Sequence, residues 1–314
     1  FNITHCDTYP PHYEKLVELL YNVNQSHVMP GNKVDFFTSG KSKFDSMFTD
    51  IRNARHHVHL LYYKIIDDNI GKELLQLLIE KVKEGVEVKV IYDDVGSLKA
   101  KNRSFEDRKR EGIEVQCYLE VRAPRFARSF NYRNHRKIAV IDGTIGYVGG
   151  MNIEDCYIDG LKWGKWCDMQ IRIEGNGVKG LQTVFLVDWY YSSKTLPDSP
   201  YYFPETPAYD DNPLQIVSSG PTDIYNSIEK GILQAINLAR KNIYIQTPYF
   251  IPSETILTAL QTAAISGIEV NVMIPKKSDS FFIDGATLSF VRDLLDYNIN
   301  VFLIQKDSCT QNVL

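Results

Sequence analysis

The residues best suited to chemistry in this sequence are a histidine and a lysine, His135 and Lys137, two positions apart at the start of an apolar run. Side chains alternate along a β-strand, so both should project from one face with their Cα atoms about 7 Å apart. An imidazole can attack phosphorus or carry a proton near neutral pH. A neighbouring ammonium offsets the charge that builds on phosphoryl oxygens. The pair therefore indicates a site for one anion.

The elements that must position this pair are predicted to be two antiparallel strands. Apolar runs at 138–141 and 145–148 flank Asp142 and Gly143, a dipeptide of the kind that closes a tight hairpin. Asp142 has the opposite strand parity from His135 and lies at the turn. We therefore expect Asp142 to brace the hairpin rather than to touch a substrate.

Small and amide side chains follow the hairpin. Gly149 and Gly150 allow a close approach of the backbone, and the Asn152 amide can then donate a hydrogen bond to an oxyanion. A histidine and a lysine at this spacing also occur by chance in ordinary hairpins. The glycine pair and Asn152 behind them favour a functional site.

The pattern H-x-K-x-x-x-x-D followed by G-G-x-N resembles the signature of the phospholipase D superfamily, and residues 132–143 look most like bacterial cardiolipin synthases. Cys167 stands where that family usually has arginine. The similarity extends over nearly the whole chain, through the segments 92–97, 166–168, 188–190, 219–221 and 246–252.

The resemblance implies an α/β fold, a phospholipase D-like two-lobe α-β-α sandwich with mixed sheets and an incomplete second lobe. It implies phosphatidyl transfer between two phosphatidylglycerols through a phosphohistidine, without a metal or other cofactor. His135 would be the nucleophile, Lys137 and Asn152 would stabilise the oxyanion, and Asp142 would brace the hairpin. Asp168 would hold the second ring nitrogen of His135. Which of two histidines attacks stays open, because this sequence has no second H-x-K.

Basic residues crowd the approach to the hairpin. Arg133 and Arg136, with Gly149 and Gly150, are the candidate substrate-binding residues. The run could receive phosphate headgroups, a membrane surface or nucleic acid, or it could be a solvated face. Its members are Arg122, Arg125, Arg128, Arg133, Arg136 and Lys137, interleaved with Phe126, Phe130 and Tyr132.

Two further groups could be interpreted as metal sites. His56, His57 and His59 enter an apolar strand with no carboxylate nearby in sequence, so we favour a structural role for them. Asp93 and Asp94 end a predicted strand, and we expect either a solvated strand end or a cap for the following segment.

Composition limits the partners. The chain has 314 residues, a formal net charge of −4 and five cysteines without C-x-x-C spacing. The charge disfavours a general nucleic-acid surface, and the cysteines favour a reducing compartment over a disulfide framework or a zinc site. We expect phosphatidylglycerol, other anionic phospholipids and a membrane surface as partners, and no nucleic acid. The oligomeric state stays open.

The expected location is the bacterial cell membrane, with the catalytic region on the cytoplasmic side. No apolar run is long enough to span a bilayer, and the chain begins at Phe1 without an initiator methionine. Cardiolipin synthases of this kind usually carry hydrophobic segments before the catalytic region. The resemblance implies that these have been left off here.

Alternating strand and helix patterns predict an α/β organisation with a long repeat. We expect an N-terminal segment at 1–31, a first lobe at 32–196, a crossover at 197–213 and a second lobe at 214–314. Predicted helices are 13–23, 44–54, 71–84 and 180–190, and predicted strands are 58–66, 86–92 and 169–173. The repeat aligns 54–60 with 239–245, 85–91 with 267–273 and 112–115 with 298–301.

The repeat stops before a second histidine strand. Cardiolipin synthases typically read Lys-Gly-Phe-Leu-His-x-Lys there, and AAA GGA TTC TTG CAC ACA AAA encodes one version. Deleting one G gives codons for Lys-Asp-Ser-Cys-Thr-Gln-Asn, which is the run at 306–312. We interpret the tail as a shifted reading frame, and the alternative is a genuinely diverged C-terminus. Two rival functions stay open: a dimeric phosphodiesterase or nuclease, and an inactive phospholipid-binding remnant.

Overall fold

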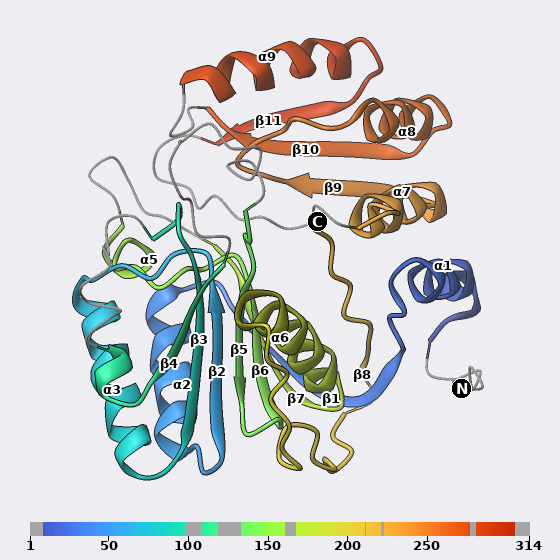
Figure 1. Cartoon of the computed structure of the whole chain (residues 1–314). Helices are drawn as coiled ribbons and strands as arrows, with labels where there is room; N and C mark the ends of the chain where they lie inside the picture. The colour runs from blue at the N-terminus through green and yellow to red at the C-terminus, as the bar shows by residue number, and fades with distance from the viewer. Residues whose placement is uncertain are drawn as a thin grey trace. The chain divides into compact units, whose positions relative to one another are not determined.

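The computed structural model describes residues 9–97, 108–118, 133–160, 168–210, 212–220, 223–276 and 281–304. The chain divides into two compact units, whose elements are labelled in Figure 1. Among the described residues, the first unit contains His27–Ile158 and Gln170–Ile216, and the second contains Tyr9–Ser26, Asp159–Met169 and the chain from Val217 onward.

A large mixed sheet forms the centre of the first unit. Its strands are β1 (Met29–Phe37), β2 (His57–Tyr62), β3 (Glu87–Asp93), β4 (Glu114–Tyr118), β5 (Lys137–Ile141), β6 (Ile145–Gly149), β7 (Gln170–Gly175) and β8 (Asn212–Leu214). They lie in the order β4-β3-β2-β5-β6-β7-β1-β8. β2, β3 and β4 pair in parallel, and the remaining pairs are antiparallel. The predicted mixed α/β fold is confirmed.

Helices cover both faces of this sheet (Figure 1). On one face, Leu61 of β2 packs in a core cluster with Phe185 and Trp189. On the other face, the hydroxyl of the next residue, Tyr62, donates to Met47 Sδ at 3.5 Å. Because adjacent strand residues point in opposite directions, this arrangement is an α-β-α sandwich. The labelled helices in the described part of the first unit are α2 (Gly40–Asn53), α3 (Asn69–Lys83), α5 (Cys156–Asp159) and α6 (Gly177–Ser193).

The predicted hairpin is present as β5 and β6. Asp142 and Gly143 have φ angles of 52° and 65°, as a two-residue turn that matches the strand twist requires. The Asp142 carboxylate accepts hydrogen bonds from the backbone N–H groups of Arg55, His56 and His57 at 2.8, 2.8 and 3.0 Å. Asp142 thus joins the turn to the start of β2.

The strand predicted at 58–66 ends at Tyr62, so its last four residues were wrongly assigned. Beyond this point the chain leaves the sheet and pairs with the loop after β6. Ile153 N–H donates to Lys64 O at 3.1 Å, and Ile66 N–H donates to Ile153 O at 3.0 Å. The other predicted helices and strands coincide with observed elements apart from a few terminal residues.

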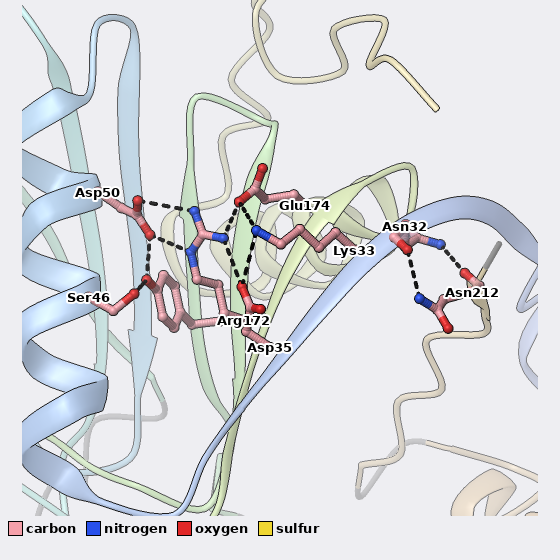
Figure 2. Close-up of polar contacts among 9 residues, drawn as sticks. Asn32, Lys33, Asp35, Ser46, Asp50, Arg172, Glu174 and Asn212 are labelled. Atoms are coloured by element: carbon pink, nitrogen blue, oxygen red, sulfur yellow. Dashed lines mark hydrogen bonds and ion pairs between the residues drawn. The ribbon is translucent and has the colours of Figure 1, made fainter. Parts of the chain in front are cut away.

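A charged cluster joins helix α2 to the sheet (Figure 2). The Arg172 guanidinium donates to both oxygens of Asp50, at 2.7 and 3.2 Å. The same guanidinium contacts Asp35 at 3.4 Å and also Glu174. Lys33 lies 3.8 Å from Asp35 and 3.9 Å from Glu174. Bidentate pairing of this kind fixes orientation as well as distance, so the cluster sets how α2 lies on β1 and β7.

A buried hydrogen-bonded network lies under α6. His57 Nε2 contacts Gln182 Oε1 at 3.2 Å, and Gln182 Nε2 contacts His59 Nδ1 at 3.0 Å. His59 Nε2 contacts Glu87 Oε1 at 3.0 Å, and the Tyr202 hydroxyl donates to the same oxygen at 2.6 Å. The histidines at these positions therefore hold the sheet, the helix and the segment after α6 together.

This network makes stability depend on pH. Burial lowers the pKa of His57 to about 3 and also lowers the pKa of His59. In the unfolded chain both should titrate near pH 6.5. Below that pH the unfolded state binds protons that the folded state excludes, so the unfolding free energy falls. For His57 alone, the expected loss between pH 7 and pH 5 is about 2 kcal/mol.

Urea unfolding at pH 7, 6 and 5 measures this dependence. His57→Gln should reduce the slope of unfolding free energy against pH, whatever its effect at pH 7. The control is His12→Gln, which changes an exposed histidine outside this network. An unaltered slope in His57→Gln would contradict the assignment.

The segment predicted as a crossover, 197–213, is attached to the first unit. The Tyr201 ring stacks on His56 at 4.0 Å between centroids. Asn212 Nδ2 donates to Asn32 O at 3.1 Å, and Asn32 Nδ2 donates to Asn212 O at 2.8 Å (Figure 2). These contacts hold β8 beside β1.

The second unit contains a three-stranded parallel sheet in the order β11-β10-β9. Its core includes Leu260, Val270, Val272 and Leu294. Its elements are the 3-10 helix η1 (Pro11–Tyr13), α1 (Glu14–Asn24), α7 (Ser227–Leu238), β9 (Asn242–Gln246), α8 (Glu254–Ile265), β10 (Glu269–Pro275), α9 (Phe281–Leu295) and β11 (Asn300–Ile304).

The helix predicted within the N-terminal segment 1–31 belongs to this second unit. Asn24 Nδ2 donates to Ser218 O at 2.7 Å, and Ser218 N–H donates to Asn24 Oδ1 at 3.0 Å. The Ser227 hydroxyl donates to Val23 O at 3.2 Å. These bonds hold α1 against α7.

The predicted repeat appears as the same local arrangement in both units. In the first, β2, α3, β3 and β4 form parallel strands with a connecting helix, and in the second β9, α8, β10 and β11 do so. The tail whose reading frame is in question, 306–312, lies outside the described residues. None of the helices in the described part of the chain combines the length and apolar character needed to cross a membrane.

Candidate functional site

The site begins with the short segment that leads into β5. Tyr63 N–H donates to Arg136 O at 3.0 Å, which continues the pairing of β2 with β5 past the last strand residue. This contact places the His135 ring against the Tyr63 ring, with centroids 4.6 Å apart and planes at 57°. The His135 side chain is otherwise exposed, so a ligand can reach the imidazole.

Lys137 is the first residue of β5 and lies opposite Tyr62. Its side chain is buried, with 3% of the residue exposed. The ammonium donates to the His135 carbonyl oxygen at 2.5 Å and lies 5.3 Å from the centroid of the Tyr63 ring. The structure therefore brings His135 and Lys137 together around Tyr63.

His135 is neutral at physiological pH. Partial desolvation by the surrounding protein, followed by the positive charges of Lys137 and Lys64, lowers its pKa to about 4. A neutral imidazole has a lone pair available for attack on phosphorus. The fraction of neutral His135 should therefore stay near its maximum from pH 8 down to about pH 5 and fall as the pH approaches 4.

Asp93 anchors the backbone just before His135. It is 1% exposed, and its Oδ1 accepts from Val95 N–H at 3.0 Å and from Gly96 N–H at 3.1 Å. Its Oδ2 accepts from Asn134 N–H at 3.1 Å. The expected cap for the following segment is confirmed. The bond to Asn134 was not foreseen, and it makes Asp93 a support for the site.

The two arginines expected to bind substrate lie against carboxylates. Arg133 Nη1 is 3.6 Å from Asp93 Oδ1, and Arg136 Nη1 is 2.8 Å from Asp188 Oδ2. Asn134 Nδ2 also donates to Asp188 Oδ2 at 2.8 Å. Burial is the main influence on Asp188 and raises its pKa. These pairs position the segment around His135, and direct binding of phosphate by the two arginines stays a prediction.

Asn152 is held on both sides of its amide. Its Oδ1 accepts from Lys64 N–H at 3.1 Å, and its Nδ2 donates to the Tyr157 hydroxyl at 3.0 Å. That hydroxyl lies 3.5 Å from Gly150 O. An amide nitrogen carries two N–H groups, so an oxyanion could be the second acceptor. Gly149 ends β6 immediately before this turn.

Asp168 lies in the second compact unit by its contacts. It is 7% exposed, and its carboxylate accepts from Met169 N–H at 2.7 Å. The predicted bond from Asp168 to a ring nitrogen of His135 stays a prediction. Cys167 and the basic residues Arg122, Arg125 and Arg128 lie outside the described residues.

Two of the three histidines considered as metal ligands, His57 and His59, belong to the network under α6, and the third, His56, stacks on Tyr201. In the described part of the chain, no group of three or more His, Cys, Asp or Glu side chains is arranged to hold a metal ion. The site as described consists of an imidazole, ammonium groups and an amide. Such donors can stabilise a phosphoryl transition state directly.

Sequence reasoning missed four contributors to the site: Tyr63, Lys64, Asp188 and Tyr157. One signal was available for the first two. They directly follow a strand that runs parallel to β3, and the carboxyl ends of parallel strands meet at one edge of a sheet. Asp93 ends β3 at that same edge.

Comparisons with known proteins agree with the resemblance. The sequence matches the family described as "Cardiolipin synthase, PLD-like domain" over residues 47–160 and 232–313. It is 40% identical over 294 residues to Cardiolipin synthase 2 of Staphylococcus epidermidis and 41% identical over 292 residues to Major cardiolipin synthase ClsA of Bacillus subtilis. Each match covers 92% of this chain but 60% of the relative, so the chain spans less than two thirds of their length.

A solved structure supports the fold. The crystal structure of phosphatidylserine synthase from Haemophilus influenzae Rd KW20 aligns with 95% of this chain and 79% of its own, with a TM-score of 0.64 and 14% identity. At that identity the alignment shows a shared fold. It leaves the chemistry to be argued from the residues around His135.

Proposed function

This chain belongs to the family of cardiolipin synthases with a phospholipase D-like domain, and from that premise we propose that it supplies the His135 half of a phosphatidyltransferase. The enzyme would convert two phosphatidylglycerols into cardiolipin and glycerol. The observation that carries this proposal is the arrangement at His135. Its neutral imidazole lies against the Tyr63 ring, its backbone carbonyl accepts from the Lys137 ammonium, and the residue is exposed to solvent.

The first step would be attack by a ring nitrogen of His135 on the phosphorus of one phosphatidylglycerol. A P–N bond forms, and the P–O bond to the departing glycerol breaks. Lys137 and Asn152 would offset the charge on the phosphoryl oxygens. Asp168 would fix the imidazole tautomer through the other ring nitrogen, as the acid does in other histidine-based sites. The departing glycerol alkoxide takes a proton from a separate acid group, which is neither His135 nor Asp168.

The second step would return the phosphatidyl group to an alcohol. A hydroxyl of the second phosphatidylglycerol gives its proton to the group that acted as the acid and attacks phosphorus, and the P–N bond breaks. A second histidine would perform this acid and base work.

The second unit offers a place for the strand that would carry this histidine. In the first unit, β2 pairs with β3 on one edge and with β5 on the other. By the internal repeat, β9 corresponds to β2. In the described residues β9 pairs with β10 alone. We propose that the other edge of β9 accepts the second H-x-K strand in antiparallel pairing.

The partner surface would be an anionic bilayer, since the substrates are bilayer lipids. The outer face of α6 presents three exposed apolar or aromatic side chains at helical spacing: Val187 at 61% exposure, Tyr190 at 54% and Tyr191 at 42%. Lys194 follows, with its ammonium 4.7 Å from the Tyr191 ring centroid. Tyrosine is favoured at membrane interfaces, and lysine is attracted to anionic headgroups. This stripe supports a peripheral lipid contact.

The test is lipid product analysis on phosphatidylglycerol liposomes. The chain as given is compared with a version whose reading frame is restored after Lys306 so that it carries the second motif. We expect cardiolipin and glycerol from the restored chain alone, at a rate at least a thousandfold above the given chain. Phosphatidic acid in place of cardiolipin would indicate hydrolysis. Cardiolipin from the given chain would indicate two His135 sites acting in a dimer, against the two-motif mechanism proposed here.

A further inference from the structure

Two cations act on His135, and they differ in accessibility. The Lys137 ammonium is buried and donates to a backbone carbonyl. Lys64 has 37% of its side chain exposed, and its charge helps to lower the pKa of His135. Of the two, Lys64 is the ammonium that a ligand at the imidazole can reach from solvent.

The backbone of Lys64 is fixed to the loop that carries Asn152. Lys64 N–H donates to Asn152 Oδ1 at 3.1 Å, and Lys64 O accepts from Ile153 N–H at 3.1 Å. Since Tyr63, the preceding residue, contacts the His135 ring, the main chain at 63–64 lies between the imidazole and the amide. The Lys64 side chain therefore begins at a backbone position next to both groups.

The side chain of Lys64 has a replaceable partner. Its Nζ lies 3.2 Å from Glu154 Oε2, and the Glu154 side chain is 21% exposed. Partly exposed ion pairs of this type contribute only a small stabilising energy. A phosphate oxygen can compete with one carboxylate at that energy, because charge-assisted bonds from ammonium to phosphate have similar or greater strength.

We propose that Lys64 binds a non-bridging oxygen of the phosphodiester that His135 engages, and that Glu154 positions the Lys64 ammonium before substrate binds. The inference rests on the proposed function for the identity of the phosphodiester. It adds a substrate-binding lysine outside the H-x-K motif. Lys137 keeps its proposed role at the phosphoryl oxygens and also holds the His135 backbone, and Lys64 supplies a second charge that is accessible from solvent.

The experiment measures phosphate binding at His135 directly, by NMR of the chain as given with labelled histidine. The His135 signal is assigned by its absence in His135→Asn. The probes are inorganic phosphate and a short-chain phosphatidylglycerol below its micellar concentration. Each is titrated at pH 7, and the dissociation constant is read from the shift of the His135 signal.

Lys64→Met should weaken binding of both probes about tenfold, and Lys64→Arg should restore most of the affinity. Glu154→Gln should bind as tightly as the unaltered chain or more tightly, because the competing carboxylate is neutralised. Lys64→Met should also raise the pKa of His135. The control is Lys41→Met, which removes one half of an exposed pair with Asp45 on α2 and should change neither reading.

If the Lys64–Glu154 pair only stabilises the fold, the variants should change stability and not phosphate binding. In that case Glu154→Gln and Lys64→Met would lower the unfolding midpoint alike and leave the dissociation constants unchanged, which would overturn the proposal. Failure of the unaltered chain to bind either probe would also overturn it. The dissociation constants are measured without any formation of cardiolipin. An inactive restored chain would therefore refute the proposed function, and it would leave the test of Lys64 unaffected.

Discussion

His135→Asn in the restored chain is expected to lower the rate of cardiolipin formation at least a thousandfold. Asparagine cannot form the P–N bond that splits the transfer into two easier steps. The loss should appear in kcat rather than in affinity for liposomes, because the imidazole acts on the reacting phosphorus. The fold should survive, since the His135 side chain is exposed and its backbone contacts do not depend on the imidazole.

The covalent intermediate allows the role of His135 to be tested by a second measurement. With phosphatidylglycerol labelled at phosphorus, the unaltered restored chain should retain label after alkaline denaturation and lose it in acid, as a phosphoramidate does. His135→Asn should retain none. His12→Asn is the control and should match the unaltered chain, since His12 is an exposed residue of η1. Label retained by His135→Asn would assign the nucleophile to the other histidine.

The pH profile follows from the same imidazole. With the pKa of His135 at about 4, the nucleophile is already deprotonated across the physiological range. A limb of the kcat/KM profile with a midpoint near pH 6 to 7 would then report the second acid and base group rather than His135. The two histidines can be distinguished in this way without assigning either from sequence position.

The hairpin and its motif could be predicted from sequence because their signals are local. The two apolar runs, the Asp142-Gly143 turn and the glycine pair all lie within twenty residues of one another. The βαβ repeat was equally visible, because each strand follows its helix at a similar distance along the chain. Local pattern and tertiary arrangement agree here, as they do in most natural sequences.

The support for the site could not be predicted in the same way, because its partners are far apart in sequence. Asp93 reaches Asn134 across 41 positions, and Asn134 reaches Asp188 across 54. The single residue Lys64 illustrates a different difficulty. An apolar strand pattern continued through Ile65 and Ile66, and only pairing with Ile153 shows that the chain has already left the sheet there.

Asp93 also supplies the second large expected effect, this time on stability. Asp93→Ala removes the acceptor of three backbone N–H groups and the partner of Arg133 from a site that is 1% exposed. Buried N–H groups that lose their acceptor, together with the lost ion pair to Arg133, should cost about 3 to 5 kcal/mol of unfolding free energy. Asp93→Asn should cost less, because its oxygen still accepts from Val95 and Gly96 while its NH2 opposes the Asn134 N–H.

Urea unfolding measures both losses, with Asp45→Ala as the control for an exposed carboxylate. That change should cost under about 1 kcal/mol. The remaining folded fraction of Asp93→Asn tests the link to the site. If Asp93 holds Asn134 and thereby places His135 on Tyr63, the His135 ring should loosen and its pKa should move back toward about 6.5. A destabilised Asp93→Asn whose His135 still titrates near pH 4 would restrict Asp93 to capping the segment after β3, and the tether to Asn134 would then be dispensable for positioning the imidazole.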